Sequence, residues 1–242
     1  MRLVVIGSSS KGNGYALISS SNEILLLEAG VKARKMLKAI DYATSGIVGC
    51  VSTHCHNDHA GQLTDYATYG FPIAANEDVF RYKNIPEHLK IILEDKKTVH
   101  FGNFGVCPFS VKHDVPTFGF LINHPECGTI LFATDCAFIP YRFPLISHLI
   151  IEANYSDEIL NDRILSGEEP PSRKRRLLET HMEIGITIKG IQKCEPHNIK
   201  TITLIHLSSQ NSDEKEFQRR VAQTFGIPTY IAKPKLVINL EK

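Results

Sequence analysis

The sequence has almost no excess of charge of either sign. Its 242 residues include 27 Lys and Arg and 26 Asp and Glu, so the formal net charge is +1. A protein that binds nucleic acid along its surface usually carries a strong positive field, because phosphates are recognised largely through their charge. The balanced composition therefore argues against a dedicated nucleic-acid-binding protein, and leaves room only for a local basic patch.

Paired cysteines and long apolar runs are also missing. The six cysteines form no CxxC pair, which suits neither a disulfide scaffold nor a zinc ribbon, and we expect reduced thiols in the cytoplasm. The apolar run in the N-terminal MRLVVIGSSSKG is too short for a signal peptide, and no later stretch is long enough to span a bilayer. We therefore expect neither secretion nor membrane insertion.

Short β-rich runs, separated by turn residues, make up most of the chain. They predict strands in both halves, at residues 2–7, 15–20, 23–30, 46–53, 89–93, 106–111, 117–122, 129–133, 147–154, 201–207, 229–232 and 235–240. Helical spacing predicts helices at residues 31–42, 156–166, 172–193 and 213–225. Two β-rich halves accompanied by helices favour two sheets packed face to face with helices outside. The expected fold is α+β, in one domain over residues 1–242.

One short stretch concentrates side chains that bind metal ions. STHCHNDHAGQL, residues 52–63, holds His54, His56, Asp58 and His59 directly after a predicted strand. Residues two apart in an extended loop point the same way, so His54 and His56 can hold one ion. A helix that begins at the next apolar residues would turn Asp58 and His59 toward a second ion. A chance histidine-rich surface loop is the alternative, but the aspartate and the preceding strand favour a two-metal motif.

Three further candidate ligands each follow a predicted apolar strand. His113 lies in SVKHDVPTFGF, Asp135 in LFATDCAF and His206 in TLIHLSSQN. Functional side chains are often placed at the ends of rigid elements. Each of the three alone is compatible with an ordinary buried or edge residue. Together with the histidine-rich stretch they indicate a metal centre.

The order of these motifs closely resembles that of the metallo-β-lactamase-fold hydrolases, whose fold is a four-layer αββα sandwich. Within that group, GSSSKGN, LLLEAG, IEANYSDEIL, KRRLLETH and IHLSSQNSDEKE resemble the exonuclease-like proteins encoded beside bacterial cell-wall regulators. HDVPTFGF and EAN are also similar to carbon-phosphorus-lyase cyclic phosphodiesterases and to transfer-RNA 3′-processing nucleases. Some phage-encoded members of the fold destroy cyclic nucleotide signals used in bacterial immunity. The resemblance therefore implies a phosphodiesterase or nuclease.

The resemblance also implies two divalent metal ions and their ligands. One ion would be held by His54, His56 and His113, the other by Asp58, His59 and His206, and Asp135 would bridge them. Nitrogen donors with a bridging carboxylate suit zinc first and manganese second. Two such ions lower the pKa of a shared water toward about 7 and neutralise charge on the phosphoryl oxygens.

The catalytic groups implied by the resemblance are His181, Glu152 and the ligand Asp58. His181 in LLETHMEIG would protonate the leaving oxygen, and Glu152 in IIEAN would orient the imidazole ring. An ordinary residue at the start of a helix is the alternative for His181. The sequence departs from these relatives after His181, in THMEIG, and at Tyr155, where they usually have histidine. These departures affect the expected identity of the substrate more than the expected hydrolytic chemistry.

Two other motifs lie beside the expected site. GSSSKGNG, residues 7–14, lacks the Lys and Ser/Thr of a phosphate-binding loop, and is expected to be a strand-to-strand turn in which residues 8–10 line the metal pocket. The basic run SRKRR, residues 172–176, allows two interpretations. It contacts phosphates of the substrate, or it is the solvated beginning of a helix.

The sequence therefore favours a metal-dependent hydrolase acting on a nucleotide-type phosphodiester, with a cyclic nucleotide ahead of a DNA or RNA strand. An ester, thioester or lactam hydrolase of the same fold is the second possibility; it would need an oxyanion donor and no acid for a phosphate leaving group. A non-catalytic metal-binding module is the third, but no expected ligand is missing. The resemblance also implies a homodimer.

Overall fold

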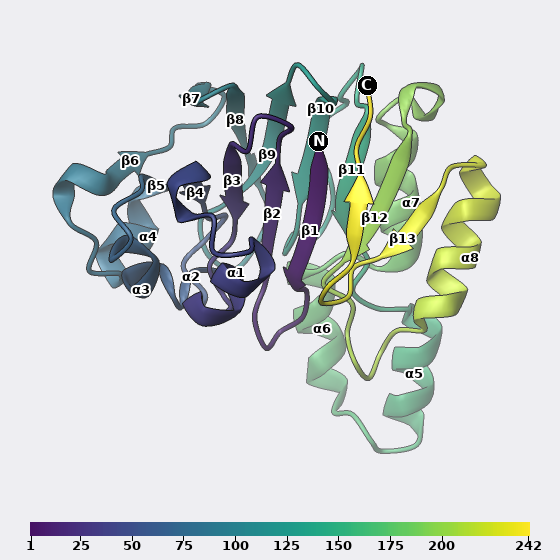
Figure 1. Cartoon of the computed structure of the whole chain (residues 1–242). Coiled ribbons are helices and arrows are strands. Elements are labelled where there is room, and N and C mark those ends of the chain that lie inside the picture. The colour runs from purple at the N-terminus through teal and green to yellow at the C-terminus, as the bar shows by residue number, and fades with distance from the viewer.

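A computed structural model describes all residues 1–242, and its strands form two seven-stranded sheets (Figure 1). The first sheet has the order β14-β1-β2-β3-β4-β5-β6, with β1 Arg2–Gly7, β2 Gly14–Ile18, β3 Ile24–Leu27, β4 Ile47–Val51, β5 Ile73–Ala75, β6 Lys90–Ile92 and β14 Val237–Asn239. The second has the order β13-β12-β11-β10-β9-β8-β7, with β7 Val99–Phe101, β8 Phe104–Val111, β9 Thr117–His124, β10 Gly128–Ala133, β11 His148–Glu152, β12 Thr201–Ile205 and β13 Thr229–Ile231. Each sheet therefore contains both antiparallel and parallel pairs.

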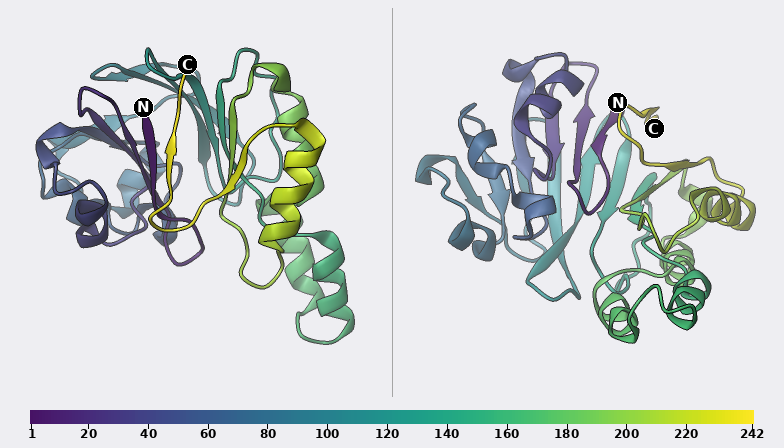
Figure 2. Two further views of the ribbon diagram at one scale, coloured as in Figure 1. Left: turned by 45° about the vertical axis from the view of Figure 1, so that its right-hand side comes forward. Right: turned by 90° about the horizontal axis from the view of Figure 1, so that it is seen from below.

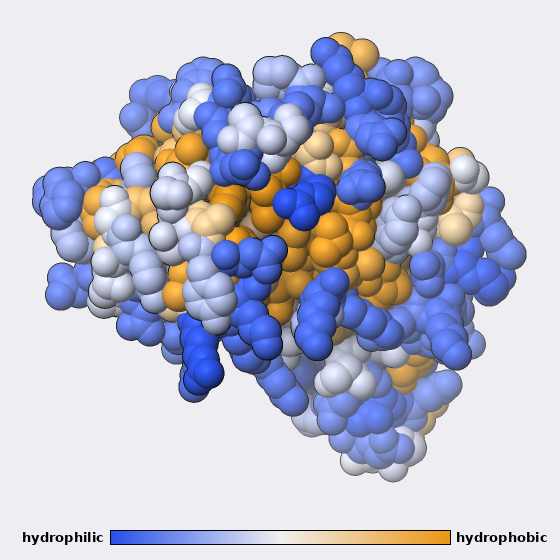
Figure 3. All heavy atoms as spheres, viewed as in Figure 1, coloured by the Kyte–Doolittle hydropathy of each residue, from blue (hydrophilic) through white to orange (hydrophobic).

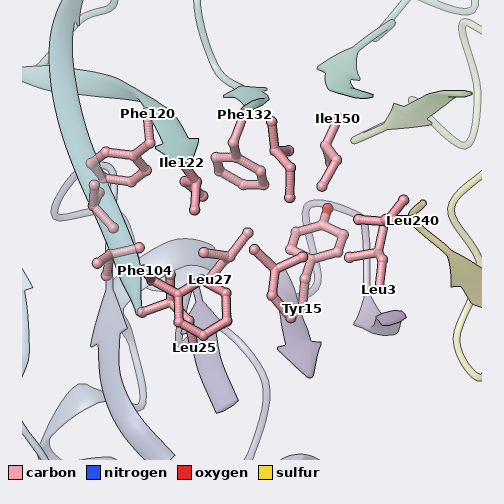
Figure 4. Close-up of a cluster of buried hydrophobic side chains, with 14 of the residues drawn as sticks. Leu3, Tyr15, Leu25, Leu27, Phe104, Phe120, Ile122, Phe132, Ile150 and Leu240 are labelled. Carbon is pink, nitrogen blue, oxygen red and sulfur yellow. The ribbon is translucent and has the colours of Figure 1, made fainter. Parts of the chain in front are cut away.

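Continuous apolar runs make the central strands of the sheets apolar on both faces. In β3, Leu25 and Leu27 point into the core between the sheets, whereas Ile24 and Leu26 belong to the cluster on the outer face. Figure 4 shows the inner core, where side chains of the first sheet such as Tyr15 meet side chains of the second such as Phe132. The rings of Tyr15 and Phe132 meet edge to face, with centroids 5.6 Å apart. Both faces of both sheets therefore need a cover.

Helices supply the outer cover. On the first sheet this cover is made by α1 Ala33–Ala39, α2 Asn57–Ala60, α3 Leu63–Ala67 and α4 Glu77–Tyr82. On the second sheet α7 Ile184–Gln192 and α8 Glu214–Phe225 bury Ile184, Ile191, Phe217 and Val221. The predicted αββα arrangement of two packed sheets between helices is confirmed.

A helical hairpin projects beyond the sheets, as both views in Figure 2 show. It consists of α5 Asp157–Leu165 and α6 Pro171–Thr180. A small separate cluster of Tyr155, Leu160 and Leu177 packs at its base. Tyr155 is buried, so this residue has a packing role at the base of the hairpin.

The prediction of one continuous helix over residues 172–193 is wrong. α6 ends at Thr180, His181 is extended with φ −138° and ψ 156°, and α7 begins at Ile184. The side chain of Glu183 caps α7 by accepting hydrogen bonds from the backbone N–H groups of Gly185 and Ile186. Helix α6 packs within the hairpin and α7 packs on the second sheet, and periodicity alone did not reveal the break between them.

An apolar region lies over β1 and β14, visible between hydrophilic side chains in Figure 3. A groove of about 450 Å³ lies there, with Val4, Ile6 and Val237 in its apolar part and Lys35 and Lys38 of α1 at its edge.

No helix of the protein has both the length and the apolar character that crossing a bilayer requires. All six cysteines are unpaired.

Candidate metal centre

The seven candidate ligands come from four loops at one edge of the two sheets, the lower edge in Figure 1. The loop after β4 and the following helix α2 carry four of them, and the loops after β8, β10 and β12 carry one each: His54, His56, Asp58 and His59, then His113, Asp135 and His206. As the sequence predicts, α2 begins directly after His56 and turns Asp58 and His59 away from the direction of the preceding loop. The fold brings all seven side chains together.

Four side chains form the first group of donors. His54 Nε2 lies 3.0 Å from His56 Nδ1, and His113 Nε2 lies 3.4 Å from the same atom. Asp135 Oδ2 is 3.9 Å from both His54 Nε2 and His113 Nε2. At these distances the four donor atoms surround one common point, where a single ion would fit.

Asp58, His59, His206 and again Asp135 form the second group. His59 Nε2 lies 3.5 Å from Asp58 Oδ2 and 3.4 Å from Asp135 Oδ2, and His206 Nε2 lies 3.5 Å from Asp58 Oδ2. The buried Nε2 atom of His206 has no hydrogen-bond partner in the protein. A buried polar atom without a partner is costly, which indicates that a ligand completes this position.

The donor spacing fits metal ions of the size of zinc. Metal–nitrogen bonds of about 2.0–2.1 Å in tetrahedral geometry place the donors about 3.3 Å apart. The distances within the two groups, 3.0 to 3.9 Å, surround this value. Asp135 belongs to both groups, and its Oδ2 lies 3.4 Å from His59 Nε2 and 3.9 Å from His54 Nε2 and His113 Nε2, so the two sets of donors share one carboxylate.

Opposite charges hold the donors in place. Burial alone lowers the pKa of His206, but the carboxylates of Asp135, Asp58 and Glu152 outweigh burial and raise this pKa to about 10. Burial likewise opposes the ionised form of Asp135, yet His206 and His59 hold the pKa of this carboxyl well below its usual range. Burial holds the pKa of His54 below its usual value. A cation entering the site would therefore displace a proton from His206, whereas His54 is ready to bind as a neutral ring.

His181 and Glu152 lie beside the two groups. His181 Nδ1 is 2.7 Å from Glu152 Oε1, and the same oxygen is 3.0 Å from His206 Nδ1. The fully buried Glu152 also accepts a hydrogen bond from the backbone N–H of Met182. Glu152 therefore positions two imidazole rings, whereas the sequence predicted this role only for His181.

The sequence did not assign a role to Glu28. This residue ends the strand motif LLLEAG, is buried, and places Oε1 3.4 Å from His59 Nδ1. Ser52 Oγ donates a hydrogen bond to Glu28 Oε2. Glu28 Oε1 and His59 Nδ1 make a charge contact rather than a hydrogen bond. Burial lowers the pKa of His59, but the charges of Asp135 and Glu28 outweigh burial and hold this pKa well above its usual value. The signal in the sequence was a charged residue at the end of an otherwise apolar strand.

The loop of residues 7–14 also contributes. Ser8 Oγ accepts a hydrogen bond from the backbone N–H of His206, at 2.9 Å, and one from the Tyr15 hydroxyl. Of residues 8–10, which were predicted to line the pocket, Ser10 is part of the wall of the cavity over the donors. The cavity has a volume of about 270 Å³, and its wall also includes His181 and two arginines of α6, Arg173 and Arg176.

Two packed sheets with helices on both outer faces define the metallo-β-lactamase fold, and the His/Asp cluster at one edge of the sheets could hold metal ions. The family model described as Anti-Pycsar protein Apyc1 matches residues 1–74, a segment that includes His54, His56, Asp58 and His59. No curated protein matches the sequence.

Solved structures support the fold. The metallo-β-lactamase fold protein YhfI from Bacillus subtilis is 16% identical and has a TM-score of 0.74, with 98% of each chain covered. Zn²⁺-bound PqqB from Methylobacterium extorquens is 16% identical with a TM-score of 0.73, over 99% of this chain and 100% of PqqB. The short form of human tRNase Z is 17% identical with a TM-score of 0.66, and both chains are covered completely.

Proposed function

We propose that the protein is a dinuclear metal-dependent phosphodiester hydrolase that acts on nucleotide-type substrates, with a cyclic nucleotide as the favoured substrate. The observation that carries the proposal is the position of Asp135 Oδ2, which belongs to two groups of four donors at once. A bridged pair of ions is suited to in-line displacement at phosphorus. In this proposal the ligands are the seven residues described above, and the chain acts as one domain.

Zinc is the proposed metal, and manganese is the second choice. Five of the seven donors are histidines and two are aspartates, a set that suits zinc and excludes the thiolate-rich sites of softer ions. When bound, the two ions would activate water and neutralise charge on the phosphoryl oxygens.

His181 is the proposed general acid. Glu152 accepts a hydrogen bond from Nδ1 of His181, so Nε2 is the nitrogen left for the substrate. The ring also lines the cavity above the donor groups, where a leaving oxygen would emerge. A proton on Nε2 can then pass to that oxygen as the bond to phosphorus breaks.

Two observations support a phosphodiester over a lactam or carboxyl ester. The Glu152–His181 pair supplies a proton donor for a leaving alkoxide. Hydrolysis of a lactam or a carboxyl ester would instead need an oxyanion donor, and no acid for a phosphate leaving group. The match of residues 1–74 to the Anti-Pycsar family model supports a cyclic nucleotide. The likeness to human tRNase Z makes a nucleic acid strand the alternative substrate within the same chemistry.

The test begins with protein stripped of metal and reloaded with zinc or manganese. We expect two ions per chain by elemental analysis, and hydrolysis of bis-p-nitrophenyl phosphate that depends on them. Cyclic mononucleotides, cyclic dinucleotides, single- and double-stranded DNA, RNA and a chromogenic β-lactam are then compared. If a nucleic acid strand is turned over faster than the cyclic nucleotides, the strand becomes the proposed substrate. Turnover of the lactam alone would reject the proposed phosphodiester hydrolysis.

We also propose that the protein works as a cytoplasmic homodimer. The six unpaired thiols fit a reducing compartment, and the resemblance to metallo-β-lactamase-fold hydrolases implies the dimer. Light scattering on the metal-loaded protein measures the mass directly, and a monomer at all concentrations would contradict the dimer.

A further inference from the structure

Helix α6 presents two unneutralised arginines to the cavity. Arg173 and Arg176 are three residues apart, so their side chains lie on the same face of the helix, and both line the cavity above the metal donors. Neither guanidinium lies within 4.0 Å of a carboxylate, and neither donates a hydrogen bond to another residue. Within the basic run of residues 172–176, these are the two charges that face the candidate site.

The other two cations of the run have partners elsewhere. Lys174 Nζ donates a hydrogen bond to Asn161 Oδ1 at 2.8 Å and lies 4.0 Å from Asp157 of α5. Arg175 lies 3.7 Å from Glu179, one turn further along α6. The helix therefore divides its charges between two faces. One face is neutralised within the hairpin, and the other points into the cavity.

The unpaired face is unfavourable without an anion. Like charges three residues apart on a helix repel each other, and positive charge near a helix N-terminus opposes the helix dipole. The first turn of α6 contains no acidic residue that would offset this charge. An anionic group in the cavity would relieve both effects, and an arginine fork matches a phosphate in charge and in geometry.

Contacts at the end of α6 fix the position of the two arginines relative to the metal centre. The ring of the ligand His113 donates from Nδ1 to the carbonyl oxygen of Thr180, at 3.0 Å, and His181 follows directly. At 1.5 Å per residue, Arg176 and Arg173 lie about 7 and about 12 Å along the helix axis from His181. The pair therefore extends away from the position where the leaving oxygen would be protonated.

We propose that Arg173 and Arg176 form a subsite for a second phosphate of the substrate, one that is not hydrolysed. The inference rests on the proposed function, in which two ions and His181 already neutralise the single charge of the diester that reacts. Leu177 is the one hydrophobic residue of the cavity wall, and no aromatic residue other than histidine lines it, so charge dominates recognition at this side. The favoured substrates are then cyclic dinucleotides or phosphorylated strands over cyclic mononucleotides.

The test uses the dinucleotide TpT and its forms with one extra terminal phosphate, pTpT and TpTp. Their affinities are measured by calorimetry on the metal-free protein, and as inhibition of bis-p-nitrophenyl phosphate hydrolysis on the metal-loaded protein. We expect the extra phosphate, at one of the two ends, to tighten binding to the wild type about tenfold. Arg173→Gln and Arg176→Gln should each remove most of this gain, and the salt dependence of binding should weaken.

Arg175→Gln is the matched control, because Arg175 lies on the same helix but pairs with Glu179. It should keep the full gain and the wild-type rate. Equal binding of all three dinucleotides by the wild type, a gain that survives in both arginine variants, or an equal loss in Arg175→Gln would overturn the subsite. Failure of the metal-loaded protein to hydrolyse bis-p-nitrophenyl phosphate would count against the proposed function, whereas calorimetry on the metal-free protein still tests the subsite.

Discussion

Three residues of the centre have a left-handed backbone that non-glycine residues rarely adopt. Glu28, Asp135 and His206 have φ of +65°, +48° and +54°, and Asp135 and His206 follow the ends of strands β10 and β12. Each such conformation costs on the order of 1–3 kcal/mol and persists only when the surroundings impose it. His206 is held through its backbone, because its N–H donates to Ser8 Oγ and its carbonyl accepts from Asn154 Nδ2. At the centre, this strained backbone belongs to residues whose side chains converge on the candidate site.

At the residue scale, His181→Ala separates proton transfer from metal binding. We expect unchanged metal content, because His181 is not one of the seven proposed ligands, although its ring lies near Asp135, Glu152 and His206. For a nucleotide with a poor leaving group, kcat should fall about 10²- to 10⁴-fold, since the leaving alkoxide loses its proton donor. Hydrolysis of bis-p-nitrophenyl phosphate should change little, because p-nitrophenolate leaves without a proton. Steady-state kinetics on both substrates measure the contrast.

The exposed His197 provides the control, since it lies after α7 and its ring contacts only Asn198. His197→Ala should retain the wild-type rate on both substrates. Near-wild-type turnover of the poor-leaving-group substrate by His181→Ala would remove His181 from the proposed mechanism.

At the scale of elements, the centre depends on three segments that touch through their backbones. The N–H of Asn13 donates to the carbonyl oxygen of Asp58 at 2.7 Å, and the N–H of Gly30 donates to the carbonyl oxygen of Asn13 at 2.8 Å. The N–H of Ala29 donates to the carbonyl oxygen of His59. The turn after β1, the end of β3 and helix α2 therefore form one hydrogen-bonded unit, which fixes where Asp58 and His59 point.

Gly30→Ala should damage this unit. A Cβ atom at residue 30 would lie 1.7 Å from the carbonyl oxygen of Asp58, and backbone atoms cannot yield as a flexible side chain can. We expect α2 to shift, at a cost of about 1–3 kcal/mol in the free energy of unfolding. Metal affinity should fall more than about tenfold, because the ligands Asp58 and His59 move with the helix. Chemical denaturation and metal competition measure the two effects.

Gly105→Ala is the matched substitution on β8, where the nearest atom to the added Cβ would be His100 Cε1 at 3.4 Å. It should leave metal affinity at the wild-type value. If Gly30→Ala binds metal as tightly as Gly105→Ala does, the close approach of the three segments does not control the site.

At the scale of the whole molecule, His148 connects the second sheet to the C-terminal end of the chain. Its Nε2–H donates to the carbonyl oxygen of Glu241, and its Nδ1 accepts from the Thr201 hydroxyl. These two contacts satisfy a neutral ring. Burial lowers the pKa of His148 to about 4, although the hydrogen bond to Glu241 acts in the opposite direction.

This lowered pKa makes the stability depend on pH. Between the unfolded value of about 6.5 and the folded value of about 4, the unfolded chain binds more protons at residue 148 than the folded protein does. Stability is therefore lost as the pH falls through this window. Between pH 7 and pH 5 the wild type should lose about 2 kcal/mol more than His148→Gln, whose side chain does not titrate. Denaturant unfolding of both proteins at both pH values measures the difference, and parallel losses would contradict the role of His148.

The sequence by itself determined the layers and the type of donor. Two β-rich halves accompanied by helices predicted two packed sheets between helices, and continuous apolar runs such as ILLL of β3 agree with this, because side chains on both faces of such a strand need a cover. The histidines and aspartates after strands β4, β8, β10 and β12 were recognisable because parallel and antiparallel strands alike expose their ends at an edge of a sheet. Side chains of a strand alternate between its two faces, so a short stretch of sequence is enough to show which faces are apolar.

Only the tertiary structure decided which side chains act together. The hydrogen bonds of Glu152 to two imidazoles, the position of Glu28 behind His59 and the division of the basic run into paired and unpaired cations join residues far apart in the chain. The break at His181 and the short helices α3 and α4 were equally hidden, because helices of five or six residues are stabilised by packing rather than by their own sequence. Spacing along the chain can indicate which residues bind a metal, but distances across the fold decide how they are oriented and what charge remains for a substrate.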